Sequence, residues 1–192
     1  MSLQLGWEKP RLINVMAKNS DFKADRNPFL KTETGWERID LREIDNLWRE
    51  IRDLYSLSIE KESRYILWRY RDNPQKRYEV VIFRGLLKRD LKAYVIIRMD
   101  NNNLSVLDFF VSKKMNFRKV LAALEHIAIK RKAKGISLWV NPEEGIYKIL
   151  RNAGYRDEKG IPYAVRIFEG SGLPPDFFLD QYCYRLGDYD AA

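Results

Sequence analysis

The fold is decided by residues 104–155, which read LSVLDFFVSKKMNFRKVLAALEHIAIKRKAKGISLWVNPEEGIYKILRNAGY. Residues 104–111 and 135–140 are apolar runs with the length of strands that are covered on both faces of a sheet. Between them, apolar side chains recur three and four positions apart, as on an amphipathic helix. They are Phe117, Val120, Leu121, Leu124, Ile127 and Ala128. A strand, a helix and a second strand in this order predict a right-handed parallel βαβ unit.

The segment that joins the first strand to the helix, residues 112–116, is basic. In a right-handed crossover it lies at the carboxyl end of the strand and at the helix N-terminus, where free N–H groups and the helix dipole attract anions. Residues 113–134 hold eight Lys and Arg residues against a single acidic one. This charge indicates either a phosphate-rich ligand, bound with help from Lys113, Lys114 and Arg118, or a solubilising helix face.

The composition predicts one main globular domain. A chain of 192 residues with 45% hydrophobic residues is long enough for one buried core. No apolar run approaches the roughly 20 residues that a membrane span needs. The start of the chain lacks a signal-peptide pattern and Cys183 has no second cysteine to pair with, so we expect a cytoplasmic protein. With His126 as its one histidine, the sequence disfavours a zinc site and a histidine-based triad, and we expect no metal.

The net charge of +8 raises the question of a nucleic-acid partner. The sequence carries no helix-turn-helix signature, zinc finger, RNP-type aromatic strand or repeated Arg/Gly tract. Nucleic acid is therefore the weakest interpretation of the basic helix.

Outside residues 104–155, the pattern predicts an antiparallel meander that leads into the βαβ unit. Residues 1–36 are irregular except for one possible strand at 11–16, because prolines and glycines interrupt them. Asp40, with Glu43 three positions later, is typical of a helix start. The further elements expected are helices at 41–54, 60–71 and 143–152 and strands at 78–83, 91–98, 163–168 and 180–186.

This order of elements resembles that of the Gcn5-related N-acetyltransferase (GNAT) superfamily over residues 37–190. Asn141-Pro142 is similar to the family's Asn-Pro after its fifth strand, and Gly154-Tyr155 to its Gly-aromatic pair after the following helix. The resemblance implies a mixed α/β sheet in which an antiparallel meander is followed by a parallel βαβ unit. It also implies an N-acyltransferase with acetyl-CoA as co-substrate, in which a primary amine attacks the acetyl-CoA thioester directly.

The resemblance also implies where acetyl-CoA binds. The family's pyrophosphate loop, Arg/Gln-x-x-Gly-x-Gly/Ala, corresponds here to residues 112–118, which contain no glycine. Glycine lets the backbone close on the phosphates without a Cβ in the way. Either lysines supply point charges in its place, or this is a degenerate, decayed site. The expected binding residues are Phe110 and Val111, through backbone N–H groups at the thioester carbonyl, and Lys113, Lys114, Asn116, Phe117, Arg118 and Asn141.

Two residues are expected to carry the chemistry. Asp108 interrupts an apolar strand. Its carboxylate either faces a cleft, where it serves as general base for the amine, or is paired with a cation such as Arg98. The tyrosine that in this family often protonates the leaving thiolate corresponds here to Leu150. Tyr147 lies one turn earlier and either reaches the cleft or packs in the core.

The first residues of the chain suggest a preceding unit. Residues 5–16 echo residues 153–168, with a Gly-aromatic pair, a charged turn with proline and a strand. We expect a GNAT-like domain at 37–192, preceded by a segment, 1–36, whose first 20 residues are the tail of an earlier GNAT-like module. Besides the acyltransferase, two interpretations stay open. One is a catalytically inactive GNAT-like binding or structural module of a tandem protein, and the other is an anion-binding module that uses the basic helix.

Overall fold

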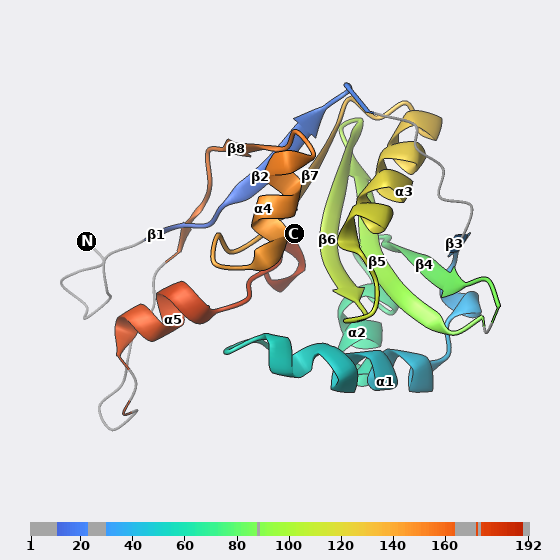
Figure 1. The fold of residues 1–192 in the computed structure, drawn as a ribbon, viewed down its shortest axis with the longest axis horizontal. Helices are drawn as coiled ribbons and strands as arrows, with labels where there is room; N and C mark the ends of the chain where they lie inside the picture. Colours follow the sequence, from blue (N-terminus) through green and yellow to red (C-terminus); the bar gives the residue numbers. More distant parts are fainter. Residues whose placement is uncertain (1–10, 23–29, 88, 164–171, 173, 190–192) are drawn as a thin grey trace.

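The computed structural model describes residues 11–22, 30–87, 89–163, 172 and 174–189. Within them, seven strands form one sheet in the order β3-β4-β5-β6-β7-β2-β8 (Figure 1). All neighbouring pairs in it are antiparallel except β6 and β7, while β1 and β9 pair separately. The strands are β1 (Arg11–Leu12), β2 (Val15–Asn19), β3 (Leu30–Thr34), β4 (Glu79–Gly85), β5 (Leu91–Asp100), β6 (Asn103–Val111), β7 (Gly135–Trp139), β8 (Arg156–Glu158) and β9 (Pro162–Tyr163).

Helices cover both faces of the sheet, with α3 and α4 on one face and α1 and α2 on the other (Figure 1). Helix α1 begins as the sequence predicts, because Asp40 accepts a hydrogen bond from the Arg42 N–H and Glu43 accepts one from the Asp40 N–H. No helix in the described ranges is long and apolar enough to cross a bilayer. The helices are α1 (Leu41–Ile51), α2 (Ser63–Ile66), α3 (Phe117–Lys130), α4 (Gly145–Asn152) and α5 (Pro175–Gln181). The described residues also form three short 3-10 helices, η2 (Trp36–Arg38), η3 (Arg52–Leu54) and η5 (Leu186–Asp188), and a π-helical segment after α2, η4 (Leu67–Arg71).

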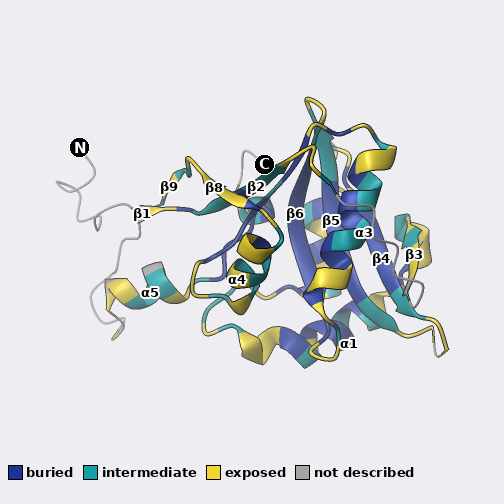
Figure 2. Ribbon diagram, turned by 45° about the horizontal axis from the view of Figure 1, so that its top comes forward, coloured by how far each residue is buried: buried dark blue, intermediate teal, exposed yellow. Residues whose placement is uncertain are grey.

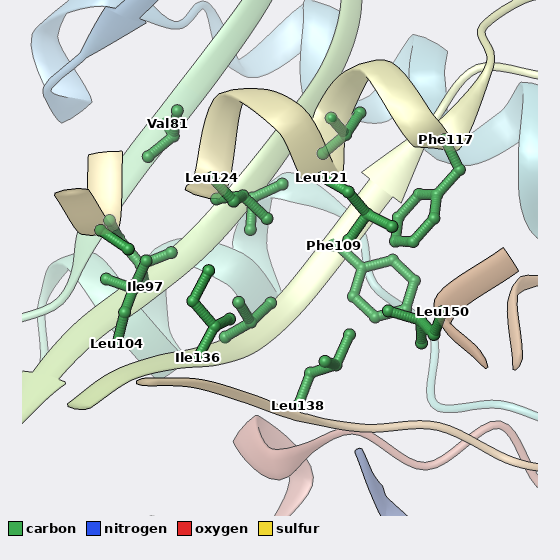
Figure 3. Packing of buried hydrophobic residues seen from close by; sticks show 14 of the residues in the cluster. Val81, Ile97, Leu104, Phe109, Phe117, Leu121, Leu124, Ile136, Leu138 and Leu150 are labelled. Carbon is green, nitrogen blue, oxygen red and sulfur yellow. The ribbon is translucent and has the colours of Figure 1, made fainter. Parts of the chain in front are cut away.

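The sheet has a hydrophobic core on each face. Against α3 and α4, Phe109 and Leu138 of the central strands pack with Phe117, Leu121 and Leu150 (Figure 3). Strands β4 to β7 are mostly buried (Figure 2), which is why the sequence of β6 reads as a continuous apolar run. The predicted mixed sheet, with an antiparallel meander of β4, β5 and β6 followed by a parallel βαβ unit, is confirmed.

Strands β6 and β7 diverge toward their carboxyl ends. Their parallel pairing ends at Val106 and Leu138, although β6 continues to Val111. An irregularity in the pairing with β5 falls at Leu107, which is left without an opposite residue. Such a bulge bends a strand and increases its twist. The bend separates the ends of the two central strands and leaves room between them.

The N-terminal strand β2 lies inside the main sheet, between β7 and β8. It pairs antiparallel with both strands, and Met16 is fully buried in the core under α3 and α4. The single strand expected at 11–16 is thus two strands, β1 and β2. Strands β2 and β3, which precede the boundary expected at residue 36, both pair in the seven-stranded sheet. The division of the chain at that residue and an earlier module remain predictions.

The C-terminal residues differ from the expectation. The prediction of a strand at 180–186 is wrong. The chain there forms the end of α5, one isolated bridge between Leu57 and Tyr182, and then the start of η5. The strand expected at 163–168 lies outside the described residues except for Tyr163, which belongs to β9. The C-terminal segment is therefore attached by individual contacts and not by a strand ladder.

Candidate functional site

A cavity of about 630 Å³ lies where β6 and β7 diverge. Its walls are formed by loop 112–117, by the start of α4, by residues 54–56 after α1 and by residues 180–183. This is the size of a pocket for a small ligand or cofactor. The cavity also lies outside the carboxyl ends of two parallel strands, where open α/β sheets bind their ligands.

The structure brings most of the expected binding residues to this cavity, but not all of them. Those in its wall are Val111, Lys113, Asn116, Phe117 and Asn141. Lys114 and Arg118 are exposed beside it, on the same loop and on the first turn of α3. The Phe110 side chain is not in the wall, because its ring is buried under α1 and α2 and stacks on Tyr94 with 4.4 Å between the ring centroids. The role expected of its backbone N–H stays a prediction.

Side-chain hydrogen bonds hold the loop at residues 112–116, which contains no glycine. The Ser112 hydroxyl and the Lys113 N–H both donate to Oε1 of Glu50, at 2.7 and 2.9 Å. The Lys114 N–H donates to the Ser112 hydroxyl at 3.2 Å, and Asn116 caps the start of α3. A carboxylate from α1 thus occupies two donors of the loop, a contact that no pattern in the sequence indicates.

Asp108 is buried in an ionic cluster formed with Lys61, Asp188 and Tyr70. Its Oδ2 accepts hydrogen bonds from Lys61 Nζ at 2.6 Å and from the Tyr70 hydroxyl at 3.0 Å. Lys61 Nζ also donates to Asp188 at 2.9 Å. Burial opposes the charged form of Lys61, but the two carboxylates outweigh it and raise the pKa of the ammonium. Asp108 is therefore paired with Lys61 and not with Arg98, and this placement does not support a role as general base.

Residues 180–189 close the inner end of the gap between β6 and β7. The Asn141 side-chain amide donates to two backbone carbonyls of this segment, at 2.7 and 3.1 Å. Arg185 forms a two-pronged contact with the Glu144 carboxylate, at 2.8 and 2.7 Å. The same guanidinium lies 4.1 Å from the centre of the Phe109 ring. Asn141 of the Asn-Pro pair thus holds residues 180–182 beside the cavity through two hydrogen bonds.

The tyrosine in the cavity wall is Tyr55, not Tyr147. The Tyr147 hydroxyl donates to the Asp157 carboxylate at 3.0 Å, outside the cavity wall. Leu150, at the position that usually holds the tyrosine, is fully buried in the core. Tyr55 lines both the cavity and a small void beside the ionic cluster. Burial raises the pKa of Tyr55 to about 12, so its hydroxyl keeps its proton at neutral pH.

Solved structures share this architecture, although no protein-family profile and no curated protein matches the sequence. A GCN5-related N-acetyltransferase from Sphaerobacter thermophilus matches 84% of this chain and 52% of its own, with a TM-score of 0.57 and 15% identity. A GCN5-related N-acetyltransferase from Anabaena variabilis matches 84% of this chain and 42% of its own, with a TM-score of 0.58 and 11% identity. L-PGS from Bacillus licheniformis matches 86% of this chain and 64% of its own, with a TM-score of 0.54 and 11% identity.

The chain therefore has the fold of the Gcn5-related N-acetyltransferases and is a divergent example of it. It spans between 42% and 64% of the length of these three proteins. A fold hosts many functions, so the activity has to be inferred from the cavity and its walls.

Proposed function

We propose that the protein is an N-acyltransferase that passes an acyl group from acetyl-CoA to a primary amine. The observation that carries this proposal is the cavity of about 630 Å³ between the diverging ends of β6 and β7. The N-acetyltransferases of the same fold support it. In the reaction, the amine nitrogen attacks the thioester carbonyl carbon, the C–N bond forms and the C–S bond breaks. The amine loses a proton, and the leaving thiolate gains one.

The residues in the cavity wall suit the parts of such a donor. Lys113, Asn116 and Phe117 lie beside the N-terminus of α3, where phosphates are favoured. Val111 ends β6, and backbone N–H groups at this strand end would polarise the thioester carbonyl. Tyr55 adjoins the ionic cluster at the inner end and is protonated, so we assign it the proton donor for the thiolate.

Calorimetry with acetyl-CoA tests the binding step. We expect dissociation constants in the micromolar range for the wild type, and about tenfold weaker binding or more for Lys113→Ala/Lys114→Ala, because charge-assisted contacts to phosphate are lost. Lys130→Ala/Lys134→Ala is the matched control, since it removes the same charge from exposed positions at the other end of α3. Equal weakening by both double variants would show that the contact is only general electrostatic attraction.

Tyr55→Phe tests the chemical step. In a screen of primary amines with acetyl-CoA, we expect kcat to fall by about 10²-fold or more with little change in KM, because the thiolate loses its proton donor. Tyr147→Phe is the control, since its hydroxyl is bonded to Asp157 outside the cavity. If the two variants release thiol at the same rate, Tyr55 is not the donor.

A catalytically inactive GNAT-like module of a longer protein is the second candidate function. Two observations favour it. Asp108, the expected base, is buried in the ionic cluster, and Arg185 lies over Phe109 at the inner end of the gap. For such a module, calorimetry detects no binding of acetyl-CoA to the wild type or to the lysine variants.

A further inference from the structure

Glu50 places a negative charge on the loop that the proposed function assigns to phosphates. Its Oε1 accepts the hydrogen bonds of the Ser112 hydroxyl and the Lys113 N–H, at 2.7 and 2.9 Å. The carboxylate stands in the last turn of α1, where the helix dipole disfavours a negative charge. The contacts with the loop are therefore what stabilises it in this position.

The same contact suits a loop without glycine. A loop that wraps a phosphate needs glycine where the ligand approaches the backbone closely. The Glu50 carboxylate lies at the end of a side chain from α1, so the loop can bind it without a glycine. The loop is closed around it by Ser112, which donates to Glu50 and accepts from the Lys114 N–H at 3.2 Å. Residues 112–114 are thus organised around an anion that belongs to the chain itself.

We propose that Glu50 competes with the phosphates of the acyl donor for the loop at residues 112–114 and so lowers the affinity for phosphate-bearing donors. This inference rests on the proposed function and assigns Glu50 as the residue that tunes donor affinity. Carboxylate and phosphate repel each other and need the same donors. Glu50 is not in the cavity wall, so a ligand that carries the thioester arm without phosphates does not meet it.

Calorimetry with three probes tests the competition: inorganic pyrophosphate, acetyl-CoA and S-acetylpantetheine. Glu50→Gln keeps an acceptor oxygen for the loop and removes the charge. We expect it to tighten pyrophosphate and acetyl-CoA by about tenfold and to leave S-acetylpantetheine unchanged. The control is Glu37→Gln, which removes an exposed carboxylate at η2 and changes none of the three constants.

The outcomes separate this inference from the proposed function. A gain for pyrophosphate, with neither thioester bound by any variant, supports the competition and contradicts the acyltransferase. No gain for pyrophosphate overturns the competition and leaves Glu50 with a structural role. Glu50→Ala guards against a Gln side chain that still blocks the loop. It frees both donors, so a gain smaller than that of Glu50→Gln, with the thermal unfolding midpoint unchanged, also overturns the proposal.

Discussion

Replacing Lys61 with Met is expected to lower the free energy of unfolding by about 3–5 kcal/mol, because it leaves buried carboxylates without their cation. The Lys61 side chain is 3% exposed, and those of Asp108 and Asp188 are 1% and 6% exposed. Met retains most of the lysine stem, so the loss reports the charge and not the packing. Asp188 belongs to η5 and Asp108 to β6, so the substitution also loosens the C-terminal segment from the sheet.

Urea unfolding followed by circular dichroism measures this effect. Lys113→Met is the control, because that lysine is exposed, and it should change the free energy by less than about 0.5 kcal/mol. Adding Asp108→Asn to Lys61→Met removes one of the two orphaned charges and should recover part of the loss. A loss below about 1 kcal/mol for Lys61→Met would contradict an ionic cluster that depends on its ammonium.

Elements with a strong local signal were predictable from the sequence. The capping residues Asp40 and Glu43 marked the start of α1, and the apolar periodicity marked α3. Strand β2 was predicted only in part, because the strand expected at 11–16 covers its first two residues but not Lys18 and Asn19. Its partner lies far along the chain, with Val15 opposite Trp139. Its place in the sheet is set by long-range packing, which composition and periodicity do not encode.

In the candidate site too, the sequence predicted the position of the loop but not the side chains that contact it. The βαβ rule put loop 112–116 at the strand end, and the cavity lies there. A carboxylate at Asp108, inside an apolar run, indicated a buried pair, but its partner Lys61 comes from 47 positions earlier. Glu50 and Tyr55 also come from a distant part of the sequence, α1 and the connection after it, so their contacts with the site were not predictable. Which side chains of one layer meet a loop of another depends on packing and not on local sequence.

A chain of residues 37–192 alone is expected not to fold cooperatively, in contrast to the full chain. The truncation removes β3, which pairs with β4 at the edge of the sheet, and it removes β2. Without β2, one edge of the central strand β7 is uncovered, and the core position of Met16, which is fully buried, is empty. The truncation also removes Lys18, whose Nζ lies 2.9 Å from Glu125 of α3 with both side chains nearly buried. Domains are stable by only about 5–15 kcal/mol, and the loss of a paired strand and its core contacts is of that order. Thermal unfolding followed by near-ultraviolet circular dichroism distinguishes the two chains.

Met16→Ala in the full chain is the matched control for this truncation. It should cost about 2–5 kcal/mol and keep a cooperative transition, because the hydrogen bonds of β2 with β7 and β8 remain. If residues 37–192 unfold with the midpoint and sharpness of the full chain, β2 and β3 are dispensable and the domain boundary at residue 36 is correct. If they become cooperative only when a peptide of residues 11–22 is added, the strand acts as a separable part of the sheet. A preceding module could supply such a strand to the sheet. That result would therefore support the predicted tandem organisation, with β2 as the strand between β7 and β8.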